Sequence, residues 1–146
     1  KYSDGEDPDE DSTHDITHDI THDINIISYF RNLRTLHISR AYLNGRYPVL
    51  FDFPYLQNLR IHYCDIKFDL EMLERFPLLK ELTISGNQYL TGNLRSLRVL
   101  KDTLEKLQIN CSNVRGNFMD LADFPRLKKL YLFDAFVFSS AFLFIS

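Results

Sequence analysis

The sequence has few of the features on which disulfide-rich or membrane-spanning proteins depend. Its only cysteines, Cys64 and Cys111, cannot build the disulfide framework of a small secreted domain. No apolar run reaches the roughly 18 residues of a transmembrane helix, and no basic segment followed by an apolar one marks a secretion signal. We therefore expect neither a membrane span nor a signal in it. Reduced thiols, as in the cytoplasm, are favoured, although the compartment stays open.

The sequence also lacks the short motifs of common enzyme classes. It has no Gly-rich phosphate loop, no nucleophile elbow, no H-E-x-x-H zinc motif and no close pair of carboxylates in an apolar setting. Cys111 has no basic neighbour that would favour its thiolate, so it is not a candidate nucleophile. We predict that the chain has no catalytic residues, needs no cofactor and is not an enzyme.

Charge is unevenly divided along the chain. Residues 1–25 hold nine acidic residues against Lys1, a net charge of −8, whereas residues 26–146 hold 16 Lys and Arg against 11 Asp and Glu, a net charge of +5. A dense acidic stretch with almost nothing to bury is typical of disorder. We therefore predict a disordered acidic leader over residues 1–25 and a folded domain over residues 26–146.

A low-complexity tract within this leader reads Thr-His-Asp-Ile three times, over residues 13–24. The spacing of four places His14, His18 and His22 along one side of a helix or of a strand. With the aspartates beside them, these imidazoles are a candidate site for Zn, Ni or Cu. The alternative, a tract without any metal site, is favoured, because β-branched Thr and Ile form poor helices and a metal site needs a folded scaffold.

The strongest pattern is the string Leu-x-x-Leu-x-Ile/Leu, which occurs five times. Its first leucine stands at positions 33, 56, 79, 104 and 127, so the steps are 23, 23, 25 and 23 residues. Repeats of this length stack into a solenoid, because a single unit cannot bury its apolar side chains whereas neighbouring units share one core. The last two apolar positions of each string are Leu36/Ile38, Leu59/Ile61, Leu82/Ile84, Leu107/Ile109 and Leu130/Leu132.

Other positions recur at the same period outside the strand motif. Glycine follows a second apolar position in three units, where the chain must turn away from the sheet (Gly45, Gly92 and Gly116). A three-residue apolar step then predicts a short 3₁₀ or helical segment on the outer side. An aromatic residue or leucine closes each unit, and proline follows three of them, where it ends any helical turn. These closing residues are Phe30, Phe53, Phe76, Leu100 and Phe124.

With these motifs, residues 30–137 resemble a leucine-rich-repeat array, whose pattern is L-x-x-L-x-L-x-x-N/C-x-L. The units are expected to start near residues 30, 53, 76, 101 and 124. The segment from Leu43 to Pro48 is also similar to the L-x-G-x-I-P element of the plant-type subclass. The resemblance implies an α/β solenoid, with a curved parallel β-sheet on the concave face and short helical, 3₁₀ or irregular segments on the convex face.

Two parts of the chain depart from the family pattern. The Asn or Cys position of each unit carries a matching residue only at Cys64 and Asn87, so we predict an incomplete hydrogen-bond ladder and a buried, structural Cys64 thiol. The apolar residues 136–146 do not resemble a capping unit. They either fold over the last repeat as a lid or belong to an array that is truncated here, and the second interpretation is favoured.

Side chains that alternate with the inward Leu and Ile point out from the concave side of the sheet. Arg60, Tyr63 and Tyr131 are the strongest candidates for partner contact, because Arg and Tyr dominate binding energies at interfaces. His37 and His62 fall on adjacent strands, but two imidazoles without a third ligand make a poor metal site. The full set of predicted contact residues is Thr35, His37, Arg40, Asn58, Arg60, His62, Tyr63, Glu81, Thr83, Lys106, Gln108, Lys129 and Tyr131.

Several functions are compatible with such a surface. The resemblance favours a non-enzymatic scaffold that binds a protein or peptide on the concave face, and the alternative is the recognition fragment of a larger receptor or signalling protein. Nucleic acid is a less favoured partner, because the basic residues are scattered and the acidic leader opposes phosphate. A further hypothesis is that the leader folds back over the basic residues of this face, Arg40, Arg60, Lys106 and Lys129.

Overall fold

The structure is a computed structural model that describes residues 29–40, 53–110, 113–133, 136–137 and 143–145. The acidic leader with its Thr-His-Asp-Ile tract lies outside the described residues, and so do the Leu43–Pro48 element and Cys111. The predictions made for these segments therefore remain predictions.

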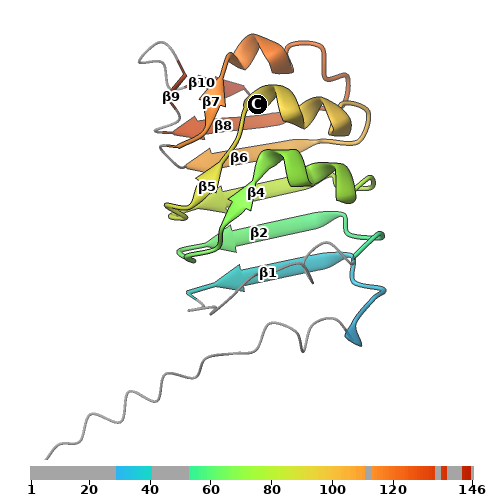
Figure 1. The fold of residues 1–146 in the computed structure, drawn as a ribbon. Helices are drawn as coiled ribbons and strands as arrows, with labels where there is room; N and C mark the ends of the chain where they lie inside the picture. Colours follow the sequence, from blue (N-terminus) through green and yellow to red (C-terminus); the bar gives the residue numbers. More distant parts are fainter. Residues whose placement is uncertain (1–28, 41–52, 111–112, 134–135, 138–142, 146) are drawn as a thin grey trace, which may run out of the picture.

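A parallel sheet is the main element of the fold, and each repeat contributes one strand to it (Figure 1). Neighbouring strands pair in matching register, so that Leu36 stands beside Leu59 and Leu59 beside Leu82. The predicted stacking of repeats is confirmed. The strands are β1 (Thr35–Ser39), β2 (Asn58–His62), β4 (Glu81–Ser85), β6 (Lys106–Asn110) and β8 (Lys129–Phe133).

A further strand, β10 (Leu143–Ile145), extends the sheet beyond β8 in the opposite direction. It pairs antiparallel with β8, with Leu143 beside Leu132 and Ile145 beside Leu130. Part of the apolar tail thus pairs with the edge of the last repeat, and a truncation of the array here stays a prediction.

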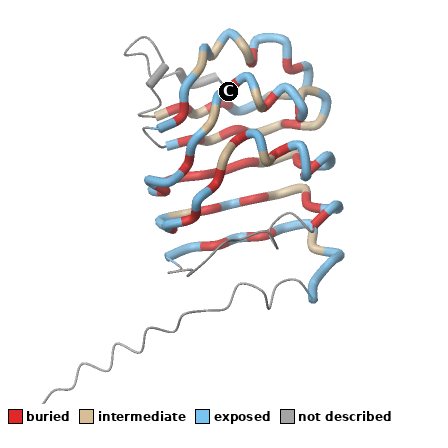
Figure 2. Tube along the Cα trace, in the orientation of Figure 1, coloured by how far each residue is buried: buried red, intermediate tan, exposed pale blue. Residues whose placement is uncertain are grey.

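The hydrophobic core lies directly behind the parallel sheet. The strands show the alternation that the sequence predicts, with buried Leu and Ile between outward residues (Figure 2). Leu82 and Ile84 on the central strand are fully buried, whereas Leu36 and Ile38 on β1 are 8% and 9% exposed. Each fully buried side chain of this size contributes about 1.5–3 kcal/mol by transfer from water. The stack is therefore held together mainly by side chains shared between repeats.

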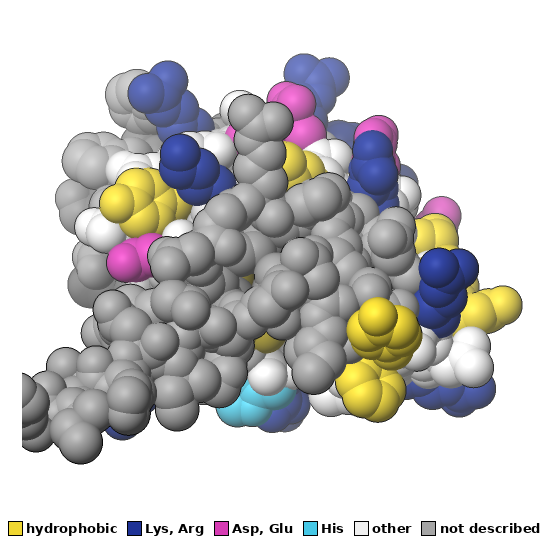
Figure 3. All heavy atoms as spheres, turned by 60° about the horizontal axis from the view of Figure 1, so that its bottom comes forward, with side chains coloured by type: hydrophobic (Ala, Val, Ile, Leu, Met, Phe, Trp, Pro, Cys, Tyr) yellow, Lys and Arg dark blue, Asp and Glu magenta, His cyan; other side chains and the backbone are white. Residues whose placement is uncertain are grey.

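A tight turn leads into most of these strands. Leu56 N–H donates to the Phe53 carbonyl at 3.1 Å, and Leu79 N–H donates to the Phe76 carbonyl at 3.0 Å. The intervening proline presets the backbone angle of the second turn residue, as the sequence predicts. Phe53 and Phe76 are completely buried, but Phe30, which was expected to have the same role, is 58% exposed. That expectation is wrong, and no described repeat precedes Phe30 to pack against its ring. On the face turned toward the β1 end of the stack, hydrophobic side chains are exposed beside Lys and Arg side chains (Figure 3).

The described convex segments are 3₁₀ helices, which decides between the alternatives that the sequence left open. They are η3 (Leu70–Arg75), η4 (Leu94–Leu100) and η5 (Phe118–Leu121). Each begins at a side-chain cap that accepts a hydrogen bond from the backbone N–H two residues further on. The caps are Asp69, Asn93 and Asn117. Such caps satisfy a donor that would otherwise be left unpaired at the helix start.

Short strands connect the main sheet to the convex side. β3 (Phe68–Asp69) pairs with β5 (Leu90–Thr91), and β7 (Arg115–Gly116) pairs with β9 (Phe136–Val137), in each case in parallel. The repeats are thus joined by backbone hydrogen bonds at a second place besides the main sheet.

The predicted glycines stand where these connecting strands approach the preceding repeat. Gly92 and Gly116 have φ angles of 114° and 125°, which L-residues rarely adopt. A Cβ at residue 92 would lie 2.8 Å from the backbone nitrogen of Leu70, and one at residue 116 would lie 2.7 Å from Asn93 Oδ1. Each glycine is therefore required both by its own conformation and by the capped helix start of the preceding repeat.

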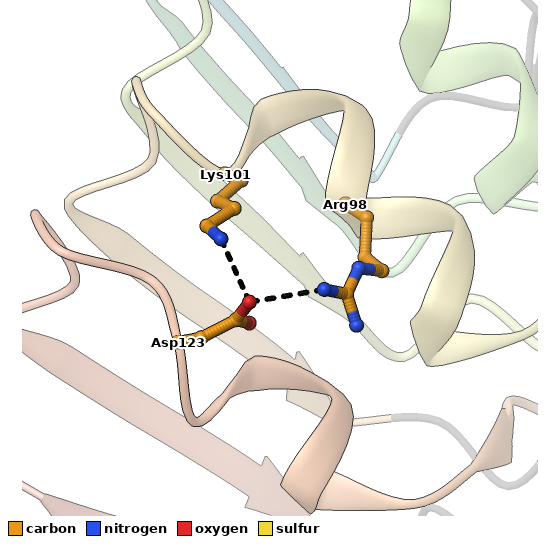
Figure 4. A network of polar contacts seen from close by, with 3 residues as sticks. All are labelled: Arg98, Lys101 and Asp123. Atoms are coloured by element: carbon orange, nitrogen blue, oxygen red, sulfur yellow. Dashed lines mark hydrogen bonds and ion pairs between the residues drawn. The ribbon is translucent and has the colours of Figure 1, made fainter.

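A small ion-pair network joins the region of η4 to Asp123, which follows η5 in the next repeat (Figure 4). One carboxylate oxygen of Asp123 lies 2.7 Å from Lys101 Nζ and 2.9 Å from Arg98 Nη2. The hydrogen bond from Lys101 is the main reason that the pKa of Asp123 is lowered. Because all of these side chains are well exposed to solvent, the network adds little stability.

Candidate functional site

The outward residues of the parallel strands line up in columns on the concave face. Strand register places His37 beside Arg60, Arg60 beside Thr83, and so on through the stack. The central column is His37, Arg60, Thr83, Gln108 and Tyr131. The columns on its two sides are Thr35, Asn58, Glu81, Lys106 and Lys129, and Ser39, His62, Ser85, Asn110 and Phe133. Every predicted contact residue within a strand therefore faces the same surface.

Exposure along these columns is uneven. His37, Arg60 and Lys129 are exposed, whereas Thr83 on the central strand is only 3% exposed. The Thr83 hydroxyl has no hydrogen-bond partner among the described residues. Thr83 was predicted as a contact residue, but its burial means that a partner could reach it only after neighbouring side chains moved.

Two imidazoles meet on the concave face. The rings of His37 and His62 lie edge to face, with centroids 5.3 Å apart and an angle of 75° between their planes. His62 Nδ1 lies 2.7 Å from the hydroxyl oxygen of Ser85. The pKa of His62 is lowered chiefly by its partial burial, and then by the charges of His37, Arg60 and Lys106. A neutral His62 ring is therefore favoured in the folded protein.

This group does not form a recognisable metal or catalytic centre. No cluster of three or more His, Cys, Asp or Glu side chains suited to a metal ion occurs among the described residues. Ser85 is only 8% exposed, so its hydroxyl is poorly placed to attack a substrate. The contact between Ser85 and His62 instead fixes the orientation of the imidazole on the surface.

Charged groups give the concave face a basic character. Glu81 is the only acidic residue among the outward positions of the parallel strands, and it lies 3.3 Å from Arg60 Nη2. Lys106 and Lys129 are register neighbours on β6 and β8. Neither lysine has an ion-pair partner among the residues that the structure describes.

Comparison with known families agrees with this architecture. A model built on the leucine-rich repeats of the FBD-associated F-box protein At5g56370 matches residues 16–142. The chain belongs to the leucine-rich-repeat family. No curated protein and no solved structure matches it. The match confirms the family that the strand motif indicated, but it does not confirm the plant-type L-x-G-x-I-P subclass. It begins within the Thr-His-Asp-Ile tract.

The family points to a protein-interaction module, and leucine-rich repeats are typically not enzymes. None of the helices in the described ranges is long and apolar enough to cross a membrane. These findings agree with the predicted class of partner, which is a protein.

One rim of the leucine-rich-repeat sheet consists of residues with left-handed backbone conformation. Arg40, Tyr63 and Gly86 follow β1, β2 and β4, and their φ angles are 50°, 50° and 62°. Tyr63 is 67% exposed, so its ring is presented at the end of the strand. Both predicted contact residues outside the strands, Arg40 and Tyr63, thus stand at the edge of the concave face.

The buried Asn or Cys position behind this rim behaves as the family pattern implies. Asn87 is 1% exposed, and its Nδ2 donates to the Ile66 carbonyl of the preceding repeat at 2.8 Å. Cys64 is also 1% exposed, and its thiol donates to the His62 carbonyl at 3.1 Å, within its own repeat. The prediction of a buried Cys64 is confirmed. The two residues thus satisfy carbonyl groups where the chain leaves the sheet.

A cavity of about 290 Å³ lies in the last repeats. Its lining includes Phe118, Met119, Phe124 and Leu130, which belong to or adjoin η5 and β8. Met119 is 59% exposed. The cavity is mainly apolar, and Lys129 of one concave column is also among its lining residues.

The sequence motif contained one signal that the prediction of site residues missed. The position directly before each strand carries Arg34, Lys80 and Lys128 in three of the five repeats. Glu105 stands at the same position before β6, where its carboxylate lies 2.8 Å from Lys128 Nζ. The hydrogen bond from Lys128 is the largest cause of the lowered pKa of Glu105. Basic residues therefore recur at the repeat period along this edge.

Proposed function

We propose that this leucine-rich-repeat array is a non-enzymatic interaction module that binds a protein partner along its concave sheet. The observation that carries the proposal is the strict register of β1, β2, β4, β6 and β8, which sets outward side chains in columns on a fully buried core. Such a platform presents polar and aromatic groups in fixed positions, which lowers the entropy lost on binding. The acidic leader over residues 1–25 is proposed to lie outside the folded array.

Particular residues are proposed to make the contacts. Arg60 and Tyr63 are the first candidates, because both are exposed and because Arg and Tyr are enriched among the residues that dominate binding energy. Tyr131 in the same central column is the third. The surrounding contact residues are proposed to be Thr35, His37, Arg40, Asn58, His62, Glu81, Lys106, Gln108 and Lys129.

The proposal is tested by affinity capture with the full chain as bait. Arg60→Glu reverses a charge in the centre of the concave face, and Arg95→Glu reverses one on η4, on the convex side. The expected result is that Arg60→Glu reduces capture of the partner by about tenfold or more, while Arg95→Glu captures as well as the wild type. Capture that is lost with Arg95→Glu and kept with Arg60→Glu would place the interface elsewhere.

The matched family supports a second candidate, in which the array is the recognition part of a larger protein. The family model is built on the repeats of an FBD-associated F-box protein. The test is to sequence the transcript through both ends of the coding region. An open reading frame that continues with a further domain supports this candidate, and stop codons that bound the present sequence contradict it.

A further inference from the structure

The strand-starting edge of the concave face carries an excess of unpaired positive charge. Its cations without an ion-pair partner among the described residues are Arg34, Lys80, Lys106 and Lys129, which we call the basic margin. The acids of this edge are already engaged, because Glu81 pairs with Arg60 and Glu105 pairs with Lys128. Among the described residues, the margin therefore lacks the counter-charges that would neutralise it.

Strand pairing concentrates this charge. Lys106 and Lys129 are direct register neighbours, and adjacent strands lie about 4.8 Å apart, so the two lysine side chains start from neighbouring backbone positions. Like charges placed side by side on a sheet are unfavourable. An anionic ligand that lay between them would relieve this repulsion as well as form new ion pairs. The pKa of His62 is lowered chiefly by burial, and the nearby charges of His37, Arg60 and Lys106 lower it further, which agrees with a positive potential on this face.

We propose that the partner segment bound on the concave face is an extended acidic polypeptide whose carboxylates pair with the basic margin. This inference rests on the proposed function and specifies its ligand. From β1 to β8 the strands span about 19 Å, which an extended chain covers with about six residues. The ligand therefore needs several acidic side chains within a short segment.

The polar groups beside the margin fit a polypeptide better than a nucleic acid. Asn58, Gln108 and Asn110 point outward and offer amide donors and acceptors to a peptide backbone. Glu81 stands within the row of cations. A polypeptide can place a neutral or basic residue opposite Glu81 and acidic residues opposite the lysines, whereas a phosphate backbone carries the same charge at every step.

The test is a fluorescence-anisotropy titration of the full chain with a labelled peptide of about 12 residues in which Glu alternates with Ser. The protein carries Asn or Gln in place of the acids of residues 4–11, so that its own leader cannot compete for the margin. The expected result is saturable binding that is about tenfold or more tighter than for the same peptide with Gln in place of Glu. The affinity is expected to fall as salt rises from about 50 to about 300 mM.

Variants locate the site and control for net charge. Lys106→Gln/Lys129→Gln is expected to weaken binding by about tenfold or more, whereas Arg95→Gln/Arg115→Gln, which removes the same charge from the other side of the repeat, stays within about twofold. Melting curves for both double variants confirm that they fold. Equal losses in the two variants, or no difference between the Glu and Gln peptides, overturn the inference.

Two further outcomes separate this inference from the proposed function. If a single-stranded oligonucleotide with the same number of negative charges binds as tightly as the peptide, the margin is a phosphate site and the inference fails. If a captured partner depends on Arg60 but hydrogen exchange maps its contact to a segment without acidic residues, the inference fails while the proposed function stands.

Discussion

The ring of Tyr63 lies directly against Gly86 in the next repeat. A Cβ at residue 86 would stand 2.5 Å from Tyr63 Cδ1 and 2.9 Å from Cε1. The two residues occupy equivalent positions, each following its strand and each with a positive φ angle. Glycine at residue 86 therefore makes room for an aromatic ring that the preceding repeat presents at the rim of the concave face.

Gly86→Ala is expected to lower the free energy of unfolding by about 1–2 kcal/mol, because an L-residue must then adopt the left-handed conformation. It is also expected to displace the Tyr63 ring and so to weaken partner binding. Urea unfolding followed by circular dichroism measures the first effect, and partner titration measures the second.

A double-mutant cycle with Tyr63→Ala separates these two causes. Removal of the ring abolishes the steric part of the Gly86→Ala effect but leaves the backbone part unchanged. The stability losses of the two single variants are thus expected to exceed that of the double variant when added. Strict additivity would show that the ring moves aside without cost.

Asn87→Ala is expected to destabilise the fold by about 1–3 kcal/mol, because it leaves buried backbone groups without partners. The groups concerned are the Ile66 carbonyl and the Tyr89 N–H, which the Asn87 side chain bonds at 2.8 Å and 3.2 Å. Chemical denaturation measures the change. The neighbouring Gln88→Ala, on an exposed side chain, serves as the control and is expected to change stability by no more than about 0.5 kcal/mol.

Thr83→Val is expected to raise the free energy of unfolding by up to about 1 kcal/mol. The substitution keeps the shape of the side chain and removes a buried hydroxyl that has no partner among the described residues. Thr83→Ser is the matched control, since it keeps the hydroxyl and loses a methyl group, and it is expected to lower stability by about 1 kcal/mol. A loss of stability in the valine variant would show that the hydroxyl is hydrogen-bonded in solution.

Stability is expected to fall as the pH drops below about 6.5, because the pKa of His62 in the folded protein is lowered from its ordinary value of 6.5. Below that pH the unfolded chain takes up a proton more readily than the folded one, so protonation favours unfolding. His62→Gln is expected to reduce the difference between melting temperatures at about pH 7.5 and about pH 5.5. An undiminished difference in the variant would assign the effect to other groups.

The fold was largely predictable because its information is local and periodic. Leu82 and Ile84 lie in the core as the strand motif predicts, and Pro77 follows the buried Phe76 at a turn as its chemistry requires. The caps at Asp69 and Asn93 were also readable in principle, since Asp or Asn recurs there at the repeat period.

Other features depended on contacts between repeats that a single unit does not encode. Thr83 occupies an outward position of its strand, yet it is only 3% exposed, which the alternation within one repeat does not predict. The left-handed backbone at Arg40 and Tyr63 could not be predicted from the residue types, because Arg and Tyr rarely adopt this conformation. The antiparallel pairing of β10 with β8 was not predicted, because residues 143–145 do not carry the strand motif of the repeats.

The contact of Gly92 with the cap at Asp69, and of Gly116 with the cap at Asn93, sets a rule for engineering the array. A repeat that is grafted into another position must carry the glycine that contacts the cap of the preceding repeat. It must also carry the Asp or Asn cap that the glycine of the following repeat contacts. A donor unit that lacks either residue would leave a steric clash on one side or an unpaired amide on the other. A grafted repeat of the right length is therefore not compatible by length alone. It must also fit the contacts with the repeat before it and the repeat after it.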